Sequence, residues 1–399
     1  PSITVGGSTG IAQKIYVRNL GEGLLNVSID GATQSGSLFH HIGRIAIEPD
    51  LLKQVEVQPG VGNASDGPGA LGGAIRFITK DPGDLLAPDE RAGALLKYGY
   101  FQNTRGFKTS ATGFGRTGGT WSGLASVVLS EHEEIEDGRG ARLAGSDTRQ
   151  ETILAKAVAE FSHGQKLRVG FEALNEEGKK LRRPEWGPSA ANPVFFMEAG
   201  RRTATVGYSV RPESTDWLDL QLNGSYTDAD IMQDAAFGPY EGDIESVQFG
   251  LKNTQRLSAH RLTYGIDYLR DEVFAGPSSN PETVSEKGEV AGLFVQGEIA
   301  ATKQLTFNAG ARFDKYELHD RRSQTFEHDG FSPNAGFRYA FTPSFNLTGG
   351  VTTALRGPDI NDAFRVDIAE NDPNLDAEKA RNYDLRFLYR RAGFTIEAG

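Results

Sequence analysis

From about residue 90 to its end, the chain consists of long segments in which hydrophobic and polar residues alternate with a period of two. Segment 216–227 is one example, because Leu220 and Leu222 alternate with Gln221 and Asn223. Such alternation predicts β-strands with one apolar and one polar face. Since the pattern runs unbroken over residues 86–399, it predicts one large, mainly β domain there.

We predict fifteen strands in this domain, most of them 10 to 13 residues long. They lie near residues 91–101, 107–116, 120–130, 151–161, 165–174, 199–210, 216–227, 243–255, 260–270, 290–299, 304–316, 333–341, 345–354, 381–389 and 392–399. Strands of soluble sandwiches average about 5–6 residues, whereas strands that cross a membrane need about 9–11. The segment length therefore favours a transmembrane antiparallel β-barrel.

The connections between these segments alternate between short and long. The short ones are 118–119, 163–165, 211–215, 256–259, 300–303, 342–344 and 390–391, and the long ones are 131–150, 175–198, 228–242, 271–289, 317–332 and 355–380. Only the joint near 102–106 is short where the alternation requires a long connection. Tight turns at one end and long loops at the other are typical of outer-membrane barrels, in which the turns are periplasmic and the loops extracellular.

Composition narrows the possibilities. The 399 residues include no cysteine, which excludes a disulfide framework and a thiolate metal site. No apolar run approaches the length of a transmembrane helix, so a membrane location requires a closed barrel. The net charge of −11 disfavours nucleic acid as a partner, because a phosphate-binding surface needs an excess of basic residues.

The N-terminal part of the chain has a different character. Residues 1–85 are rich in glycine and predict short strands near 15–18, 26–29, 54–58 and 74–79. We therefore predict a separate N-terminal α+β domain over residues 1–85 and a barrel over residues 86–399. The stretch Gly67–Gly72 matches the GxGxxG pattern of dinucleotide sites, but a strand pattern follows it where that fingerprint needs a helix. We interpret these glycines as tight-turn residues.

The two ends of the chain lead to a further expectation. No signal peptide precedes Pro1, and fifteen strands is an odd number, whereas bacterial single-chain barrels close on an even number. We therefore expect the complete protein to extend beyond this chain at both ends.

Several motifs resemble the TonB-dependent outer-membrane transporters. The runs IYVR (15–18), SIDG (28–31), LKQVEV (52–57) and GALGGAIRFIT (69–79) resemble the plug domain of that family. The runs FVQGE (294–298), GARFD (310–314), SPN (332–334) and the stretch 374–383 resemble its barrel. Within the family, residues 39–44, 48–53 and 84–86 resemble the enterobactin-receptor branch typified by the neisserial FetA/FrpB transporters.

The resemblance implies a barrel of roughly 22 strands in the bacterial outer membrane, with residues 1–85 as a plug in its lumen. The TonB-box segment, the first part of the plug and about seven closing strands are then expected outside this chain. The implied function is import of a ferric siderophore, with a catecholate such as enterobactin as the expected ligand, driven by TonB with ExbB and ExbD. Lipopolysaccharide and outer-membrane lipid are the expected surroundings. No covalently bound cofactor is implied, since ferric iron or the ferric siderophore is the transported ligand.

Enzymatic activity is not expected, because the sequence offers no grouping of nucleophile, base and orienting residue and no GxSxG elbow. A passive porin or an adhesin barrel is the alternative of a different class. Porins lack an N-terminal plug of this composition, so a structure with residues 1–85 in the lumen would remove that alternative.

The candidate ligand site lies between two predicted plug strands. We expect Gln34, Phe39, His40, His41 and Arg44 to form the apical plug surface that faces the extracellular vestibule. The two histidines are the candidate iron ligands, because imidazole is a good ligand for iron. The alternative is a histidine pair that bonds only the plug's own backbone.

A basic run in the predicted 175–198 loop is the second candidate region. Lys179, Lys180, Arg182 and Arg183 lie together there, and Arg182 and Arg183 are the predicted ligand-binding residues. A ferric catecholate is trianionic, so a cationic patch on an acidic protein would attract it. Contact with lipopolysaccharide phosphates, or simple solvation, is an equally good explanation, and Arg321 and Arg322 share this ambiguity.

A haem receptor is the nearest alternative within the family. Such receptors tend to place a histidine between an FRAP-like and an NPNL-like motif, and LRGP (355–358) and DPNL (372–375) occupy those places here. Because no histidine lies between them, the sequence disfavours haem. Only the histidine pair of the plug supports it.

Two further predictions concern structure. We expect the plug to be held in the lumen by polar contacts to barrel residues such as Arg312 and Asp314. We also expect Glu56 and Arg76, on plug strands, to have polar partners, because unpaired charges are costly inside a protein.

Overall fold

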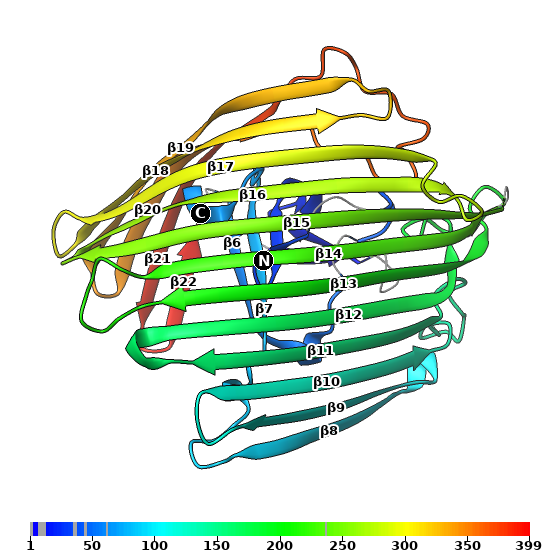
Figure 1. Cartoon of the computed structure of the whole chain (residues 1–399), viewed down its shortest axis with the longest axis horizontal. Helices are drawn as coiled ribbons and strands as arrows, with labels where there is room; N and C mark the ends of the chain where they lie inside the picture. Colours follow the sequence, from blue (N-terminus) through cyan, green and yellow to red (C-terminus); the bar gives the residue numbers. More distant parts are fainter. Residues whose placement is uncertain (1–2, 7–12, 35–37, 44–45, 61–62, 236–237) are drawn as a thin grey trace.

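The fold is taken from a computed structural model that describes residues 3–6, 13–34, 38–43, 46–60, 63–235 and 238–399 (Figure 1). One antiparallel sheet of 15 strands dominates it, in the order β22 to β8, so that each strand pairs with its neighbours in sequence. The strands are β8 (Ala92–Phe101), β9 (Gly106–Arg116), β10 (Trp121–His132), β11 (Thr148–Glu160), β12 (Gln165–Leu181), β13 (Val194–Val210), β14 (Leu220–Ala235), β15 (Gly238–Leu257), β16 (His260–Pro277), β17 (Val284–Ala300), β18 (Leu305–His319), β19 (Thr325–Thr342), β20 (Phe345–Arg356), β21 (Glu378–Arg391) and β22 (Phe394–Ala398).

All fifteen predicted strands are therefore present. Many of them continue beyond their predicted ends at the side of the long connections, and β15 reaches 20 residues. The predicted long loop 228–242 is wrong, because β14 and β15 run through it as a hairpin with residues Asp228 and Glu245 directly paired. The predicted short turn 211–215 is instead the longer connection 211–219 between β13 and β14.

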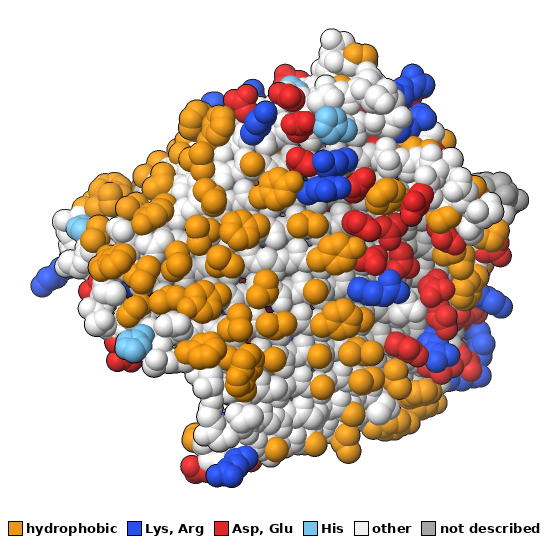
Figure 2. All heavy atoms as spheres, in the orientation of Figure 1, with side chains coloured by type: hydrophobic (Ala, Val, Ile, Leu, Met, Phe, Trp, Pro, Cys, Tyr) orange, Lys and Arg blue, Asp and Glu red, His pale blue; other side chains and the backbone are white. Residues whose placement is uncertain are grey.

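The outer face of the sheet changes character along the strands. On β15, Val247 and Phe249 are exposed apolar residues, whereas Glu241, Asp243 and Glu245 carry charge toward the hairpin with β14. Figure 2 shows the same division, with hydrophobic side chains gathered over much of the face and acidic ones over the strand ends at the right. An apolar outer band of this kind is typical of membrane-facing barrel strands. Helices contribute no span, since none in the described part of the chain is both long and apolar enough to cross a membrane.

The N-terminal residues form small sheets on the concave side of the large sheet (Figure 1). One sheet has three strands, β1 (Ile3–Gly6), β2 (Lys14–Val17) and β3 (Leu20–Gly21), and the other has the order β5-β4-β7-β6. Its strands are β4 (Asn26–Ile29), β5 (Ala32–Thr33), β6 (Leu52–Pro59) and β7 (Gly73–Thr79), and β4 pairs with β7 in parallel. The helical turns are of the 3₁₀ type: η2 (Glu22–Leu24), η3 (Pro49–Leu51), η4 (Ala64–Asp66) and η5 (Pro82–Asp84). Val17, Val27, Ile29, Ile75 and Phe77 form the buried core of this plug.

The inner wall of the large sheet holds the plug through buried polar contacts. Arg312 on β18 donates from Nη1 to the carbonyl oxygen of Ala64, and the side chain of Gln296 on β17 accepts from the Ala64 amide at 2.9 Å. The expected contact of Arg312 with the plug is thus confirmed. Asp314 acts indirectly, because its fully buried carboxylate holds Arg312 at 2.6 Å and Asp267 does so at 2.9 Å.

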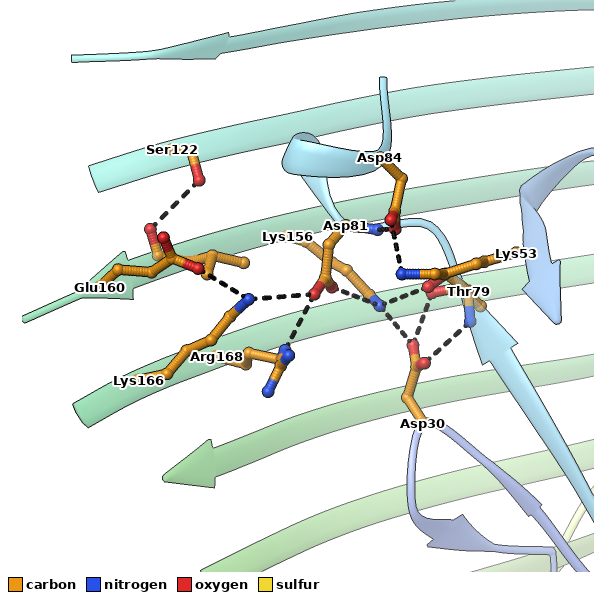
Figure 3. A network of polar contacts seen from close by, with 11 residues as sticks. Asp30, Lys53, Thr79, Asp81, Asp84, Ser122, Lys156, Glu160, Lys166 and Arg168 are labelled. Atoms are coloured by element: carbon orange, nitrogen blue, oxygen red, sulfur yellow. Dashed lines mark hydrogen bonds and ion pairs between the residues drawn. The ribbon is translucent and has the colours of Figure 1, made fainter. Parts of the chain in front are cut away.

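A second set of contacts joins the end of the plug to β11 and β12 (Figure 3). Lys156, nearly buried on β11, lies 2.8 Å from Asp30 and 3.4 Å from Asp81. Asp81 also accepts from Arg168 of β12 at 2.9 Å, and Asp30 accepts from the Thr79 hydroxyl at 2.6 Å. These residues form an ionic clamp, which joins the turn after β4 and the segment after β7 to the barrel.

The two charged plug residues singled out from sequence have different environments. Arg76 forms an ion pair with the buried Asp66, as predicted. Glu56 is exposed, and it accepts a hydrogen bond from Gln54 at 3.0 Å. The expected polar partners are therefore confirmed for both, although only Arg76 is in a partly buried position.

Candidate functional site

The plug segment that carries Phe39, His40 and His41 lies at the end of the sheet with the longer connections. Phe39 is buried against Met197 of β13 and Ile231 of β14, and its ring lies 4.9 Å from that of Phe364 in the β20–β21 connection. The apolar Phe39 therefore anchors the segment, which allows the two histidines that follow it to meet the loops of the barrel.

His40 is the exposed member of the pair, with 44% of its side chain accessible. Its Nδ1 atom lies 3.2 Å from Oδ2 of Asp362, a largely buried carboxylate in the β20–β21 connection. The Lys14 ammonium donates to the His40 carbonyl oxygen at 2.6 Å. His40 thus presents an accessible imidazole, and its Nδ1 atom is already in contact with Asp362.

His41 is buried, and its Nδ1 lies 2.7 Å from Oε1 of Glu185 in the β12–β13 connection. Burial lowers the pKa of His41 below its ordinary value, although the hydrogen bond with Glu185 acts in the opposite direction. Burial alone would raise the pKa of Glu185, but the His41 hydrogen bond and the Lys14 charge hold it below its usual range. His41 therefore joins plug and loop.

The basic run divides into members with separate roles. Lys180 is fully buried, lies 3.2 Å from Glu176 and donates to the Asp147 carbonyl at 2.6 Å, so it cannot attract an external anion. Arg182 is exposed. Arg183 stacks over the Trp186 ring at 4.5 Å, and that ring meets His41 edge-on at 5.5 Å. Arg183 is thus brought beside the histidine pair.

Gln34 lies apart from the histidines. It is buried, its Nε2 donates to the Ala32 carbonyl oxygen at 3.1 Å, and it lines a crevice between plug and wall that encloses about 640 Å³, open mouth included. Tyr316 and Arg356 line the same crevice from the barrel. The fifth predicted plug residue, Arg44, lies outside the described residues.

Three further histidines, His132 at the end of β10, His319 at the end of β18 and His328 on β19, have partners other than the plug pair. His328 lies 2.8 Å from the Leu375 carbonyl oxygen, and His319 lies 2.7 Å from Glu317. His132 lies 2.8 Å from the Thr104 hydroxyl. In the part of the chain that the structure describes, no three His, Cys, Asp or Glu side chains are placed to share a metal ion.

Sequence reasoning did not select Glu185, Trp186, Asp362 or Phe364. Each comes from a barrel connection and reaches the plug only through the fold, since Glu185 is 144 residues and Asp362 322 residues from its histidine. Their loops were predicted as vestibule elements, but nothing in the local sequence distinguishes these two carboxylates from the other acidic residues nearby.

Comparison with known proteins identifies the family of this chain. The plug description of TonB-dependent receptors matches residues 1–74, and the TonB dependent receptor-like β-barrel matches residues 138–399. The heme transporter BhuA of Brucella abortus is 28% identical over 96% of this chain and 59% of its own length. A hemin receptor of Yersinia enterocolitica is 26% identical over 91% of this chain and 54% of its own.

Among solved structures, the FrpB iron transporter of Neisseria meningitidis shares the fold with a TM-score of 0.91 at 22% identity, over 99% of this chain and 66% of that one. The chain covers only part of these proteins, about 59% of the length of the Brucella relative. Because the barrel match alone covers more than half of the sequence, the chain belongs to the TonB-dependent receptor family, whose members are outer-membrane β-barrels with an internal plug.

Proposed function

We propose that the complete protein imports haem across the bacterial outer membrane, with His40 as the iron ligand contributed by the plug. The observation that carries this proposal is the accessible His40 imidazole at the meeting point of the plug and two barrel connections. Imidazole nitrogen is a common axial ligand of haem iron. The family consists of receptors and transporters, so binding and passage of cargo are the functions sought, not catalysis.

The surroundings of His40 suit a planar, mainly apolar cargo with acidic edges. The rings of Phe39 and Trp186 contact the histidine pair, and Phe364 packs against Phe39. Arg182 and Arg183 add positive charge in the same loop region. Two relatives bear names that specify haem or hemin, which supports the same choice. The 359–371 stretch contains no histidine, which disfavoured haem in the sequence. In the structure, Asp362 of that stretch contacts His40 of the plug, so the stretch still contributes to the proposed haem site.

A ferric catecholate is the second candidate. Lys14, Arg182 and Arg183 lie at or near the pair and would attract a trianionic chelate. In that case the histidines would donate hydrogen bonds to the chelate and would not ligate iron.

The remaining parts of the transport cycle are also proposals. We infer that residues 1–85 act as the plug domain and residues 86–399 as barrel, that TonB with ExbB and ExbD supplies the energy, and that Arg44 joins the ligand surface. Contact with lipopolysaccharide is expected at the outer rim.

Ligand titration of the complete purified receptor tests the proposal. Wild type and His40→Ala are titrated with haem, followed by its visible absorption, and separately with ferric enterobactin. His260→Ala is the matched control, since this exposed histidine begins β16 at the short-turn end. We expect His40→Ala to weaken haem binding by at least about tenfold, equivalent to 1.4 kcal/mol, and the control to bind normally. A wild type that binds ferric enterobactin but no haem would favour the second candidate, and unchanged haem affinity in His40→Ala would refute the role of His40.

A further inference from the structure

We propose that Asp362 is the positioning residue of the plug histidine: its carboxylate accepts the Nδ1 proton of His40, which fixes the imidazole so that Nε2 is the atom presented to the cargo. This inference rests on the proposed function, because it assigns the cargo to His40. It adds that the donor strength of this ligand is set by a barrel connection and not by the plug itself.

The contact has the geometry that this role requires. The Asp362 side chain is only 7% accessible, whereas that of His40 is 44% accessible, so the carboxylate is buried in the β20–β21 connection and the ring is open to solvent. The second carboxylate oxygen of Asp362 accepts the Phe364 amide at 3.1 Å. An ionised carboxylate has no hydrogen to donate, so Nδ1–H of His40 is the donor in the contact with Oδ2, and in the neutral ring Nε2 then carries the free electron pair.

The connection that carries Asp362 is itself anchored on both sides. Its neighbour Asn361 donates backbone and side-chain hydrogen bonds to Glu286 of β17, a carboxylate with only 2% of its surface accessible. Ala363 donates its amide to the Leu38 carbonyl oxygen of the plug at 3.1 Å and packs in a buried apolar cluster with Val366. Asp362 is thus fixed between two anchored residues, which gives its carboxylate a set direction.

The pair of His41 and Glu185 provides a contrast within the same segment. It has a similar carboxylate contact at 2.7 Å, yet His41 is buried and stands edge-on to Trp186. A carboxylate that accepts from one nitrogen of a metal-binding histidine increases the basicity of the other nitrogen and fixes the ring orientation. Of these two histidines, His40 is the one that combines such a carboxylate with an accessible ring, so Asp362 and not Glu185 is the residue that tunes the ligand.

The experiment uses the complete receptor in three forms: wild type, Asp362→Asn and Asp362→Ala. Glu370→Gln is the matched control, because Glu370 lies in the same connection but pairs with Arg322 on the surface. Resistance of the barrel to heat on a gel verifies folding of each variant, and Asp362→Asn keeps the shape if the alanine variant does not fold.

The first readout is the tautomer of His40, measured by nitrogen NMR on histidine-labelled protein without cargo. We expect the Nδ1–H form in wild type and in Glu370→Gln, and a gain of the Nε2–H form in both Asp362 variants. An Asp362 variant with the wild-type tautomer would overturn the inference. Since no haem is present, this result decides the inference even if haem binding, and with it the proposed function, fails.

The second readout is the reduction potential of the bound haem, which a merely structural role would not shift. We expect the potential to rise from wild type to Asp362→Asn and further to Asp362→Ala, because a less basic imidazole stabilises ferric iron less well. Haem affinity should fall by roughly 10- to 100-fold, the range for loss of such a partner. Equal potentials in all four proteins would overturn the tuning role while leaving haem binding itself in place.

Discussion

Lys156 of the barrel places its Nζ 2.8 Å from Oδ2 of Asp30 in the plug, although 126 positions separate the two residues along the chain. The same ammonium lies 3.4 Å from Asp81, so one barrel lysine joins two plug segments (Figure 3).

Replacement of Lys156 by methionine should loosen the plug. Removal of one partner of a buried ion pair costs about 3–5 kcal/mol, and the partial exposure of Asp30 and Asp81 puts the expected loss near the lower end. Lys53→Met is the control, because its pair with Asp84 is exposed and is worth about 0–1 kcal/mol. Urea unfolding of the plug measures both, followed by a dye on a single introduced cysteine. Equal midpoints for the two variants would contradict the prediction.

Acid should weaken the same clamp through Asp81. Burial alone would raise the pKa of Asp81, but Lys156, Arg168 and Lys166 hold it below its ordinary value. Because the unfolded chain then takes up the proton first, the contribution of Asp81 to stability is complete above the ordinary pKa of about 3.9 and is lost as pH falls through the lower folded value. Plug stability in urea should therefore fall more steeply below pH of about 4 in wild type than in Asp81→Asn. Parallel profiles for the two proteins would show that Asp81 does not carry this dependence.

Gly73→Ala should destabilise the plug strongly. Gly73 begins β7 with φ of +120°, and an added Cβ would lie 2.1 Å from the Gln58 carbonyl oxygen. The backbone conformation alone costs about 1–3 kcal/mol for a residue with a side chain, and the backbone clash adds to it. Gly83→Ala, with no atom within 4 Å of its Cβ, should change stability by less than about 0.5 kcal/mol. Urea midpoints of the two variants check this, and a normal Gly73→Ala plug would contradict it.

Arg312→Met should disturb both the barrel wall and the plug. The substitution leaves the fully buried Asp314 and its neighbour Asp267 without their guanidinium partner, at a cost of about 3–5 kcal/mol, and it removes a contact of Ala64. The exposed Arg338 of β19 supplies the control, Arg338→Met. Temperature-dependent mobility on a gel reports the barrel, and protease access to the plug reports its release. A fully protected plug in Arg312→Met would argue against the contact.

The strands were predictable because the period of two is a local property of the sequence. The strand at residues 26–29 has the bounds that its pattern predicted, and the charged Arg312 was expected on the lumen face. The hairpin of β14 and β15 was not predicted, because acidic residues such as Asp228 and Glu241 suggested a loop. In the structure they lie on the outer face of continuous strands, beyond the apolar band, where charge is compatible with strand pairing.

The candidate site was predictable only in part. The adjacent histidines were visible in the sequence, but the partners of His40 and His41 come from distant connections, and only the fold brings Asp362 and Glu185 to them. The role of Lys180 was also hidden, since a basic run suggests a surface patch whether or not one member is buried beside an acidic residue such as Glu176.

The length of β15 has a mechanical consequence for the outer part of the receptor. Residues 238–246 continue the strand past the apolar band by about 30 Å, at about 3.4 Å per residue, and they remain paired to β14 and β16 throughout most of that length. In this part of the barrel, the wall above the lipid is therefore a hydrogen-bonded sheet and not a set of loops. Proteases bind extended chain that is free of such pairing, so their cleavage sites would be confined to the connections outside the strands, such as 133–147, 182–193 and 357–377.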